Sequence, residues 1–374
     1  MISMSNGNIK RKMLVIDGAM VSRSPHVAVY LDILDEFGIA YDVIGWNRKG
    51  DDISDLPEYF LIYDHITDDH YSPLRKVIEI FNFYRFAKNI INRSSYDGIV
   101  IFEIANSLFF YQLLKKQFKG KYIFDIRDYS PFCKLKIANF FLDKLIHNSY
   151  RTVISSKGFT AWLPSEYEYV ISHNISPAML QNYKNFEFRQ FHEPVKLLTI
   201  GNLRDPDTNI AFLCGFGNNK NYAMSFVGDG YAQPLIKKIS DEQHISNVTY
   251  FGHYEKKDEV EFYKQSDMIN CCMDDNLTSK YLMSNRIYLA ALFRKPIICI
   301  EGSYQSDIVR KYQLGIVVQN IENIEVEVRD YINTFSLMDF VMGCEKFLNV
   351  VGSEQKKYVS ELKAFTETIY DAIN

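Results

Sequence analysis

Short apolar runs alternate with longer amphipathic segments along the first half of the 374-residue chain. Turn residues such as glycine and aspartate bound most of the apolar runs, which is typical of strands in βαβ units. Amphipathic helices are predicted between them, and this order indicates a parallel sheet in a doubly wound α/β domain. The predicted strands are residues 13–17, 40–44, 96–102, 121–125, 152–155 and 169–172, and the predicted helices are residues 27–37, 74–93 and 107–118.

The same pattern restarts after Pro194 and predicts a second parallel sheet, with a helix beginning near Ser284 and a long final helix over residues 354–373. We therefore expect an N-terminal Rossmann-like domain over residues 1–190 and a C-terminal one over residues 191–352. Residues 353–374 are expected to form a helix that packs back toward the N-terminal domain. The predicted strands of the second sheet are residues 195–200, 223–227, 248–251, 268–272, 296–300 and 316–318.

The composition narrows the class of protein. Hydrophobic residues make up 47% of the chain and charged residues 24%, which predicts packed cores rather than disorder. A net charge of −4 argues against a general nucleic-acid-binding protein. The six cysteines form no C-x-x-C pair and no cluster with histidine, so we expect reduced thiols in a cytoplasmic protein and no zinc site. No apolar run approaches the roughly 20 residues of a membrane span.

Two stretches place arginine beside backbone that can bind an anion. Gly201 ends a predicted strand and permits close approach of a ligand, and Arg204 follows with a planar guanidinium suited to phosphate. The same residues are also compatible with a surface turn. Ser284 and Asn285 are favourable N-cap residues, and Arg286 follows them. A cation at a helix N-terminus is unfavourable by roughly 0.3–1 kcal/mol, so Arg286 favours a site that receives an anion.

Two further turns follow predicted strands of the second half. Gly228 and Asp229 begin a glycine-containing turn that is compatible with a nucleotide site and equally with an ordinary turn. Gly252, His253 and Tyr254 follow the next strand. Their rings can stack on or hydrogen-bond a planar base, although such residues also occur in purely structural loops.

These stretches, in this order and spacing, resemble the nucleotide-sugar-binding half of GT-B glycosyltransferases, especially the retaining family 4 type. The matching motifs in the second half are FVGDG, FGHY, FYKQSDMIN and SNRIYLAALFRKPI. In the first half they are SPHV at residues 24–27, YIFDIRD at 122–128, and VISSKGFTAWLP at 153–164 followed by His173-Asn174. The resemblance covers most of the chain. It implies a GT-B fold, in which two doubly wound Rossmann-like domains face each other across a cleft.

The resemblance implies a hexosyltransferase that moves a sugar from a nucleotide-sugar to a glycan acceptor, with retention of configuration. We expect the acceptor to be lipid-linked and to belong to surface-polysaccharide synthesis, such as capsule, exopolysaccharide or O-antigen. Neither a metal nor another cofactor is expected, because arginine and a helix N-terminus can neutralise the diphosphate. The expected donor-binding residues are Gly201, Arg204, Gly228, Asp229, Gly252, His253, Tyr254, Asp274, Asp275, Ser284, Asn285, Arg286 and Tyr288.

The N-terminal domain is expected to hold the acceptor. Asp128 is the expected catalytic carboxylate, with Asp125 and His26 behind it. The two aspartates are also compatible with a local ion pair to Arg127.

The sequence departs from the resembling family at two acidic positions. Family members carry two glutamates separated by seven residues, and the corresponding positions here are Tyr281 and Leu289. In the family, the second glutamate holds the ribose hydroxyls, and a leucine cannot accept those hydrogen bonds. Ribose recognition would then fall to water, backbone or Tyr288. Two alternatives therefore stay open, a nucleotide-sugar epimerase of the same architecture and a non-catalytic protein that binds a sugar nucleotide or a partner protein.

A basic helix suggests a membrane surface as a further partner. Residues 74–93 contain five lysines and arginines against the single acid Glu79, with aromatic side chains among them. A basic helix with aromatics can lie on an anionic bilayer, although its apolar stripe also fits an ordinary core-facing helix. The expected localisation is cytoplasmic, with the inner face of the plasma membrane as a peripheral site.

Overall fold

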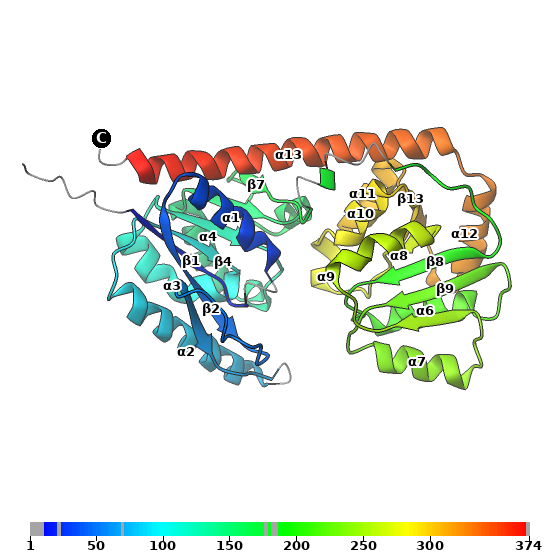
Figure 1. Ribbon diagram of the computed structural model, residues 1–374, viewed down its shortest axis with the longest axis horizontal. Coiled ribbons are helices and arrows are strands. Elements are labelled where there is room, and N and C mark those ends of the chain that lie inside the picture. The colour runs from blue at the N-terminus through cyan, green and yellow to red at the C-terminus, as the bar shows by residue number, and fades with distance from the viewer. Residues whose placement is uncertain (1–10, 21–23, 69–70, 176–178, 181–185, 372–374) are drawn as a thin grey trace, which may run out of the picture. The chain divides into compact units, whose positions relative to one another are not determined.

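The computed structural model describes residues 11–20, 24–68, 71–175, 179–180 and 186–371. The chain divides into two compact units, each built around one sheet (Figure 1). Unit 1 comprises Met1–Ser172 together with Glu354–Asn374, and unit 2 comprises His173–Ser353. Within the described residues, no helix combines the length and the apolar character needed to cross a bilayer.

Unit 1 contains a seven-stranded sheet in the order β3-β2-β1-β4-β5-β6-β7, and its described pairings are all parallel. Its strands are β1 (Lys12–Ile16), β2 (Ala40–Asn47), β3 (Phe60–Asp64), β4 (Gly98–Phe102), β5 (Tyr122–Ile126), β6 (Arg151–Ile154) and β7 (Tyr169–Ile171). Its helices are α1 (Pro25–Glu36), α2 (Pro73–Ile91), α3 (Ile104–Gln117) and α4 (Lys136–Asn148), with short 3₁₀ turns at Pro131–Lys134 and Lys157–Ala161.

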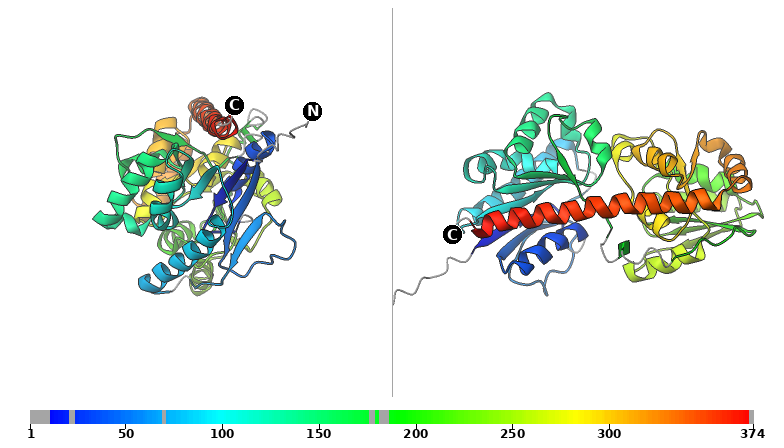
Figure 2. Two further views of the ribbon diagram at one scale, coloured as in Figure 1. Left: turned by 90° about the vertical axis from the view of Figure 1, so that its left-hand side faces the viewer. Right: turned by 90° about the horizontal axis from the view of Figure 1, so that it is seen from above.

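Helices cover both faces of this sheet. Tyr30 on α1 and Tyr358 on α13 (Leu337–Asp371) share one core with strand residues such as Val15 and Val100. Helices α2 and α4 lie on the other side of the sheet from α1 (Figure 2, left). Helix α3 contacts both α2 and α4. This is the doubly wound arrangement that the sequence pattern predicts.

Unit 2 contains a six-stranded sheet in the order β10-β9-β8-β11-β12-β13, again with parallel pairings throughout the described strands. Its strands are β8 (Val195–Ile200), β9 (Tyr222–Val227), β10 (Val248–Phe251), β11 (Met268–Asn270), β12 (Ile297–Ile300) and β13 (Gly315–Val318). Its helices are α6 (Pro206–Phe216), α7 (Gln233–Glu242), α8 (Glu259–Gln265), α9 (Leu277–Tyr281), α10 (Asn285–Leu292), α11 (Tyr304–Tyr312), α12 (Ile324–Asn333) and the first part of α13, with 3₁₀ turns at Lys256–Asp258 and Ile321–Asn323. The predicted α/β class is confirmed in both units.

The sequence pattern leaves several features of the fold unplaced. It gives no range for strand β3, for helix α4 or for helices α6 to α9, α11 and α12. The final helix begins at Leu337 rather than at residue 354, and residues 372–374 of the predicted helix lie outside the described part of the chain. The added part of the helix contains Gly343, where a Cβ would lie 1.8 Å from the carbonyl oxygen of Tyr312. This glycine therefore serves close packing of α13 and does not end the helix.

A buried polar network ties α1 and the sheet of unit 1 together. Arg127 donates from Nη2 to Asp125 Oδ2 at 2.5 Å and to Ser172 Oγ at 3.2 Å. The hydroxyl of Tyr30 donates to the same Asp125 oxygen at 2.7 Å, and its ring meets that of Tyr358 on α13 at 6.0 Å. Burial and the charge of Asp125 raise the pKa of Tyr30 well above its ordinary value, so its hydroxyl remains a donor. Asp125 itself is fully buried.

We predict that Asp125→Ala destabilises the protein by about 3–5 kcal/mol, because it leaves the buried guanidinium of Arg127 without its carboxylate. Chemical denaturation followed by circular dichroism measures the change. Asp32→Ala on the exposed side of α1 is the matched control, and its effect should stay within about 0.5 kcal/mol. Equal stability of the two variants would contradict a structural role for this pair.

Candidate functional site

The order of the strands in unit 2 reverses at β8, which pairs with β9 on one side and with β11 on the other. In open parallel sheets, ligands bind outside the carboxyl ends of the strands at such a switch point. The segments at this edge are the turn after β8, the turn after β11 and the first turn of α10. These segments contain seven of the predicted donor-binding residues, namely Gly201, Arg204, Asp274, Asp275, Ser284, Asn285 and Arg286.

Two hydrogen bonds fix the side chain of Arg286 at this edge and leave other N–H groups of its guanidinium unused. It donates from Nη1 to the carbonyl oxygen of Asn270 at 2.8 Å and from Nε to Ser284 Oγ at 3.3 Å. A guanidinium has five N–H donors, so the remaining ones stay available. Ser284 also caps α10 through a bond from the Arg286 backbone N–H at 3.4 Å. The predicted N-cap role of Ser284 is confirmed.

Arg204 is half-buried and makes no hydrogen bond or ion pair with any residue that the structure describes. Its neighbour Asp205 is buried and precedes α6. Burial raises the pKa of Asp205, whereas the backbone N–H of Asp274 and the charges of Arg286 and Arg204 oppose that rise. Both arginines are therefore close enough to Asp205 for their charges to act on the same carboxyl group.

Asp274 is engaged within the protein. Its Oδ1 accepts from the backbone N–H and the hydroxyl of Thr208, each at 2.8 Å, so it caps the first turn of α6. Asp275 and Asn285 are exposed. Neither makes a described hydrogen bond or ion pair through its side chain. The structure therefore uses Asp274 to fix the turn beside Arg204 and leaves Asp275 and Asn285 facing solvent.

The glycine turns after β8 and β9 pack directly on each other. Gly228 has φ +112°, and a Cβ there would lie 2.1 Å from the carbonyl oxygen of Gly201. The backbone N–H of Leu203 donates to the carbonyl oxygen of Asp229 at 2.9 Å. His253 lies opposite, with Nδ1 3.5 Å from Asp229 Oδ2, and both side chains are mostly exposed. The two turns thus form one backbone-linked rim at the carboxyl edge.

Tyr288 is more buried than the two arginines, and Tyr254 is half-buried as they are. The hydroxyl of Tyr254 donates to Glu259 Oε1 at 3.3 Å, and burial together with Glu259 raises the pKa of Tyr254. Tyr288 is 1% exposed and its hydroxyl lies 2.8 Å from His173 Nδ1. Both rings belong to the core or pack against it. Gly252 directly precedes His253 and is exposed.

The carboxyl edge of the unit 1 sheet gathers acidic side chains. Asp128 is exposed after β5, and His26 Nε2 lies 3.5 Å from Asp17 Oδ2. Glu103 follows β4 with φ +68°, a backbone conformation that is uncommon outside glycine. Burial, followed by the charges of Asp128, Asp17 and Asp125, raises the pKa of Glu103 well above its ordinary value.

Sequence reasoning missed Asp17 and Glu103. Each directly follows a buried strand, in LVID and VIFE, and this position alone would have placed it at the carboxyl edge. Asp125, in contrast, lies in the closed network with Arg127 and Tyr30. Its ion pair is the alternative that the sequence left open. Among the described residues, no group of three or more His, Cys, Asp or Glu side chains is arranged to hold a metal.

Solved structures with this architecture cover nearly the whole chain. A sucrose-phosphate synthase from Thermosynechococcus elongatus aligns with 97% of this chain and 99% of its own, at 12% identity and a TM-score of 0.66. An α,α-trehalose-phosphate synthase (UDP-forming) from Burkholderia vietnamiensis aligns with 95% and 100%, at 8% identity and a TM-score of 0.65. The chain has the GT-B fold.

A third GT-B structure, WaaG, is a glycosyltransferase involved in lipopolysaccharide biosynthesis. It aligns with 94% of this chain and 99% of its own, at 12% identity and a TM-score of 0.60. No protein-family model matches the sequence, and no curated protein sequence matches it significantly. Within the GT-B fold, the strand switch point of unit 2 is the site that combines exposed turns with unused cationic donors.

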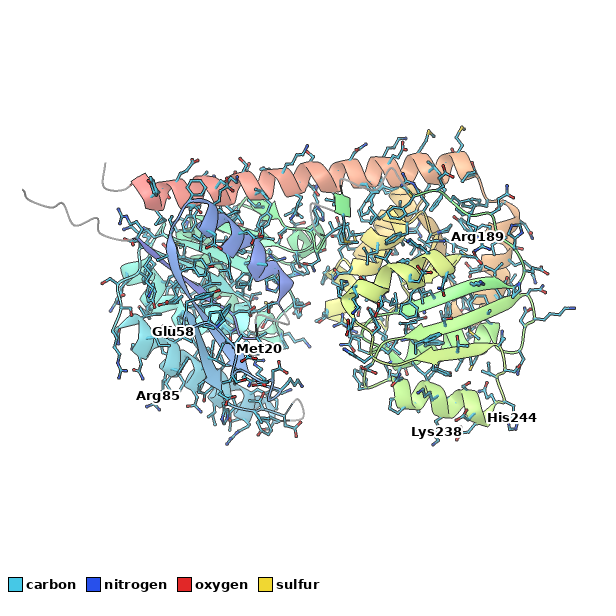
Figure 3. All side chains as sticks on the ribbon, in the orientation of Figure 1. Met20, Glu58, Arg85, Arg189, Lys238 and His244 are labelled. Atoms are coloured by element: carbon cyan, nitrogen blue, oxygen red, sulfur yellow. The ribbon has the colours of Figure 1, made fainter. Side chains whose placement is uncertain are left out.

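We predict that Glu103→Gln stabilises the protein more at high pH than at low pH. A carboxyl whose folded pKa is raised contributes stability below its unfolded pKa, and this contribution is lost as pH rises through the folded pKa. Melting temperatures of variant and wild type, compared between about pH 4 and about pH 8, measure the difference. The melting temperature of the variant should rise relative to that of the wild type as the pH increases. Exposed Glu58, labelled in Figure 3, provides the control Glu58→Gln, and a pH-independent difference at Glu103 would contradict the prediction.

Proposed function

We propose that the protein is a glycosyltransferase that moves a hexosyl group from a nucleoside-diphosphate sugar to a glycan acceptor. The observation that carries this proposal is the pair Arg204 and Arg286, whose unused N–H donors lie at the strand switch point of unit 2. Beside them, the N-terminus of α10 adds the positive end of the helix dipole. A diphosphate matches this combination of charge and directed donors.

The transfer needs little covalent help from the protein. The bond between the anomeric carbon and the donor phosphate oxygen breaks, and the nucleoside diphosphate leaves with the electron pair. The acceptor hydroxyl oxygen forms the new bond to the anomeric carbon and releases its proton to a base. Negative charge develops on the leaving diphosphate, where Arg204 and Arg286 stabilise it. We therefore propose a metal-independent reaction without a further cofactor. Retention of configuration is proposed from the sequence resemblance alone.

We propose that the carboxyl edge of unit 1 binds the acceptor. Exposed Asp128 and half-buried Glu103 supply carboxyl groups there, with His26 beside Asp17. A lipid-linked acceptor in surface-polysaccharide synthesis is the proposed class. Its support is the sequence resemblance and the fold that this chain shares with WaaG, which is involved in lipopolysaccharide biosynthesis.

One observation favours a non-catalytic sugar-nucleotide-binding protein as the second candidate. Leu289, at the position of the family's ribose-binding glutamate, is 6% exposed and lies in the core of unit 2. A panel of UDP-, GDP- and dTDP-sugars separates the candidates. Donor hydrolysis or transfer supports the glycosyltransferase, binding without turnover supports the second candidate, and isomerisation of the donor would indicate an epimerase.

We predict that Arg204→Ala weakens binding of the preferred nucleoside diphosphate by about 10- to 100-fold, the loss expected for charge-assisted hydrogen bonds. Arg204 makes no described hydrogen bond or ion pair, so its removal should leave the fold intact. Arg286→Ala should weaken binding similarly. Isothermal titration calorimetry measures the affinity.

The matched control is Arg329→Ala, which removes an exposed arginine paired with Glu325 on α12. Its affinity should equal that of the wild type. If Arg204→Ala and Arg286→Ala both bind as tightly as Arg329→Ala, the site lies elsewhere.

A further inference from the structure

Exposed apolar side chains gather on two helices of unit 1. Among the described residues of this unit, six of the nine exposed large apolar side chains lie on α2 or at the start of α4. On α2 they are spaced four and three residues apart, so they share one stripe of the helix. The exposed fractions are 72% for Leu74, 43% for Ile78, 45% for Phe81, 52% for Leu135, 63% for Ile137 and 55% for Phe140.

These two helices flank α3 on one face of the sheet. The ring of Phe81 on α2 meets that of Phe109 on α3 at 6.3 Å, and Tyr111 on α3 meets Phe141 on α4 at 5.0 Å. Helices α2 and α4 are therefore fixed on the same side of unit 1, as Figure 2 also shows. We call the six exposed residues on them the apolar footing.

The charge around the apolar footing is strongly positive. Helices α2, α3 and α4 together contain eight lysines and arginines and only two acids, although the whole chain carries a net charge of −4. Both acids are engaged. Glu79 is buried and bonded to Arg75 at 2.6 Å, and Asp143 pairs with Lys144 at 3.2 Å.

Most of the basic side chains have no internal counter-charge. Lys76, Arg85 and Lys88 on α2 and Lys136 on α4 are exposed and make no ion pair within the described residues. Arg85 projects from the outer side of α2 (Figure 3). Lysine and arginine beside exposed leucine, isoleucine and phenylalanine form the pattern of a surface that inserts apolar side chains and keeps cations at lipid head groups.

We propose that α2 and the start of α4 dock unit 1 on a bilayer that contains anionic phospholipid. The apolar footing enters the head-group region, and the surrounding lysines and arginines contact the lipid phosphates. A nucleic acid would match the charge but gain nothing from the exposed aliphatic side chains. This inference rests on the proposed function in one respect, because a lipid-linked acceptor would give the docking a purpose. Docking itself requires no turnover.

Flotation of the full chain with phosphatidylcholine vesicles, with and without phosphatidylglycerol, tests this inference. The wild type should bind only the phosphatidylglycerol vesicles, and binding should fall as salt screens the charges. Ile137→Ser/Phe140→Ser and Arg85→Glu/Lys88→Glu should each reduce binding about tenfold or more. All these positions are exposed, and unchanged melting temperatures verify that the variants remain folded.

Two control variants carry the same kinds of substitution on the surface of unit 2. Met338→Ser/Met342→Ser removes exposed apolar side chains from α13, and Lys237→Glu/Lys238→Glu reverses charges on α7. Both controls should bind vesicles as the wild type does. Absence of wild-type binding, or equal losses in the controls, would overturn the proposal. A further outcome would also overturn it. If the wild type self-associates, and Ile137→Ser/Phe140→Ser makes it monomeric without changing vesicle binding, the apolar footing joins two copies of the chain instead.

Glycosyl transfer, measured beside vesicle binding on the same proteins, separates this inference from the proposed function. Vesicle binding that depends on the footing, in a protein without glycosyl transfer, would support docking and reject the transferase. Transfer to a water-soluble acceptor without vesicle binding would support the transferase and reject docking.

Discussion

The parallel direction of the strands is the constraint from which the candidate sites follow. All described pairings in both sheets are parallel, so within each unit the strand carboxyl ends meet at one edge. Turns that are far apart in the sequence, such as those after β8 and β11, are brought together there. Glycine makes the fit possible at Gly228, whose missing side chain lets its turn pack on the turn of Gly201. The cationic site then needs only side chains projecting from turns that the sheet has already positioned.

Most strands could be predicted because parallel strands covered by helices on both faces are short and continuously apolar. Strand β3 escaped because it lies at the edge of its sheet, where its residues are only partly buried and its polar neighbours obscure the pattern. The start of α13 escaped for another reason. Gly343 and Gly352 have the sequence appearance of helix breakers, yet both lie inside α13. The close approach of Tyr312 accounts for Gly343 and becomes visible only in the folded unit.

The sequence identifies the arginines of the candidate site more readily than the environments of its acidic residues. Arg204 and Arg286 stand out in sequence because their charge lies beside a strand end and a helix start. An aspartate near a strand end is ambiguous, since neighbouring side chains decide its environment. Asp125 is enclosed by Arg127 and Tyr30, whereas Asp128, three residues later, is exposed. Glu103 acquires its raised pKa from burial and from carboxylates on other segments, which no local pattern reveals.

Helix α10 combines a polar first turn with a buried body. All residues from Ile287 to Leu292 are buried, so the body of the helix forms part of the unit 2 core. A glutamate at Leu289 would need a hydrogen-bonding partner in that core or would incur the cost of burying an unpaired charge. The first turn, in contrast, projects from the core, with Asn285 exposed and Arg286 half-buried. The proposed phosphate site at the start of the helix therefore does not depend on an acid in its buried body, and under the same proposal the contacts to ribose come from the turns around the helix.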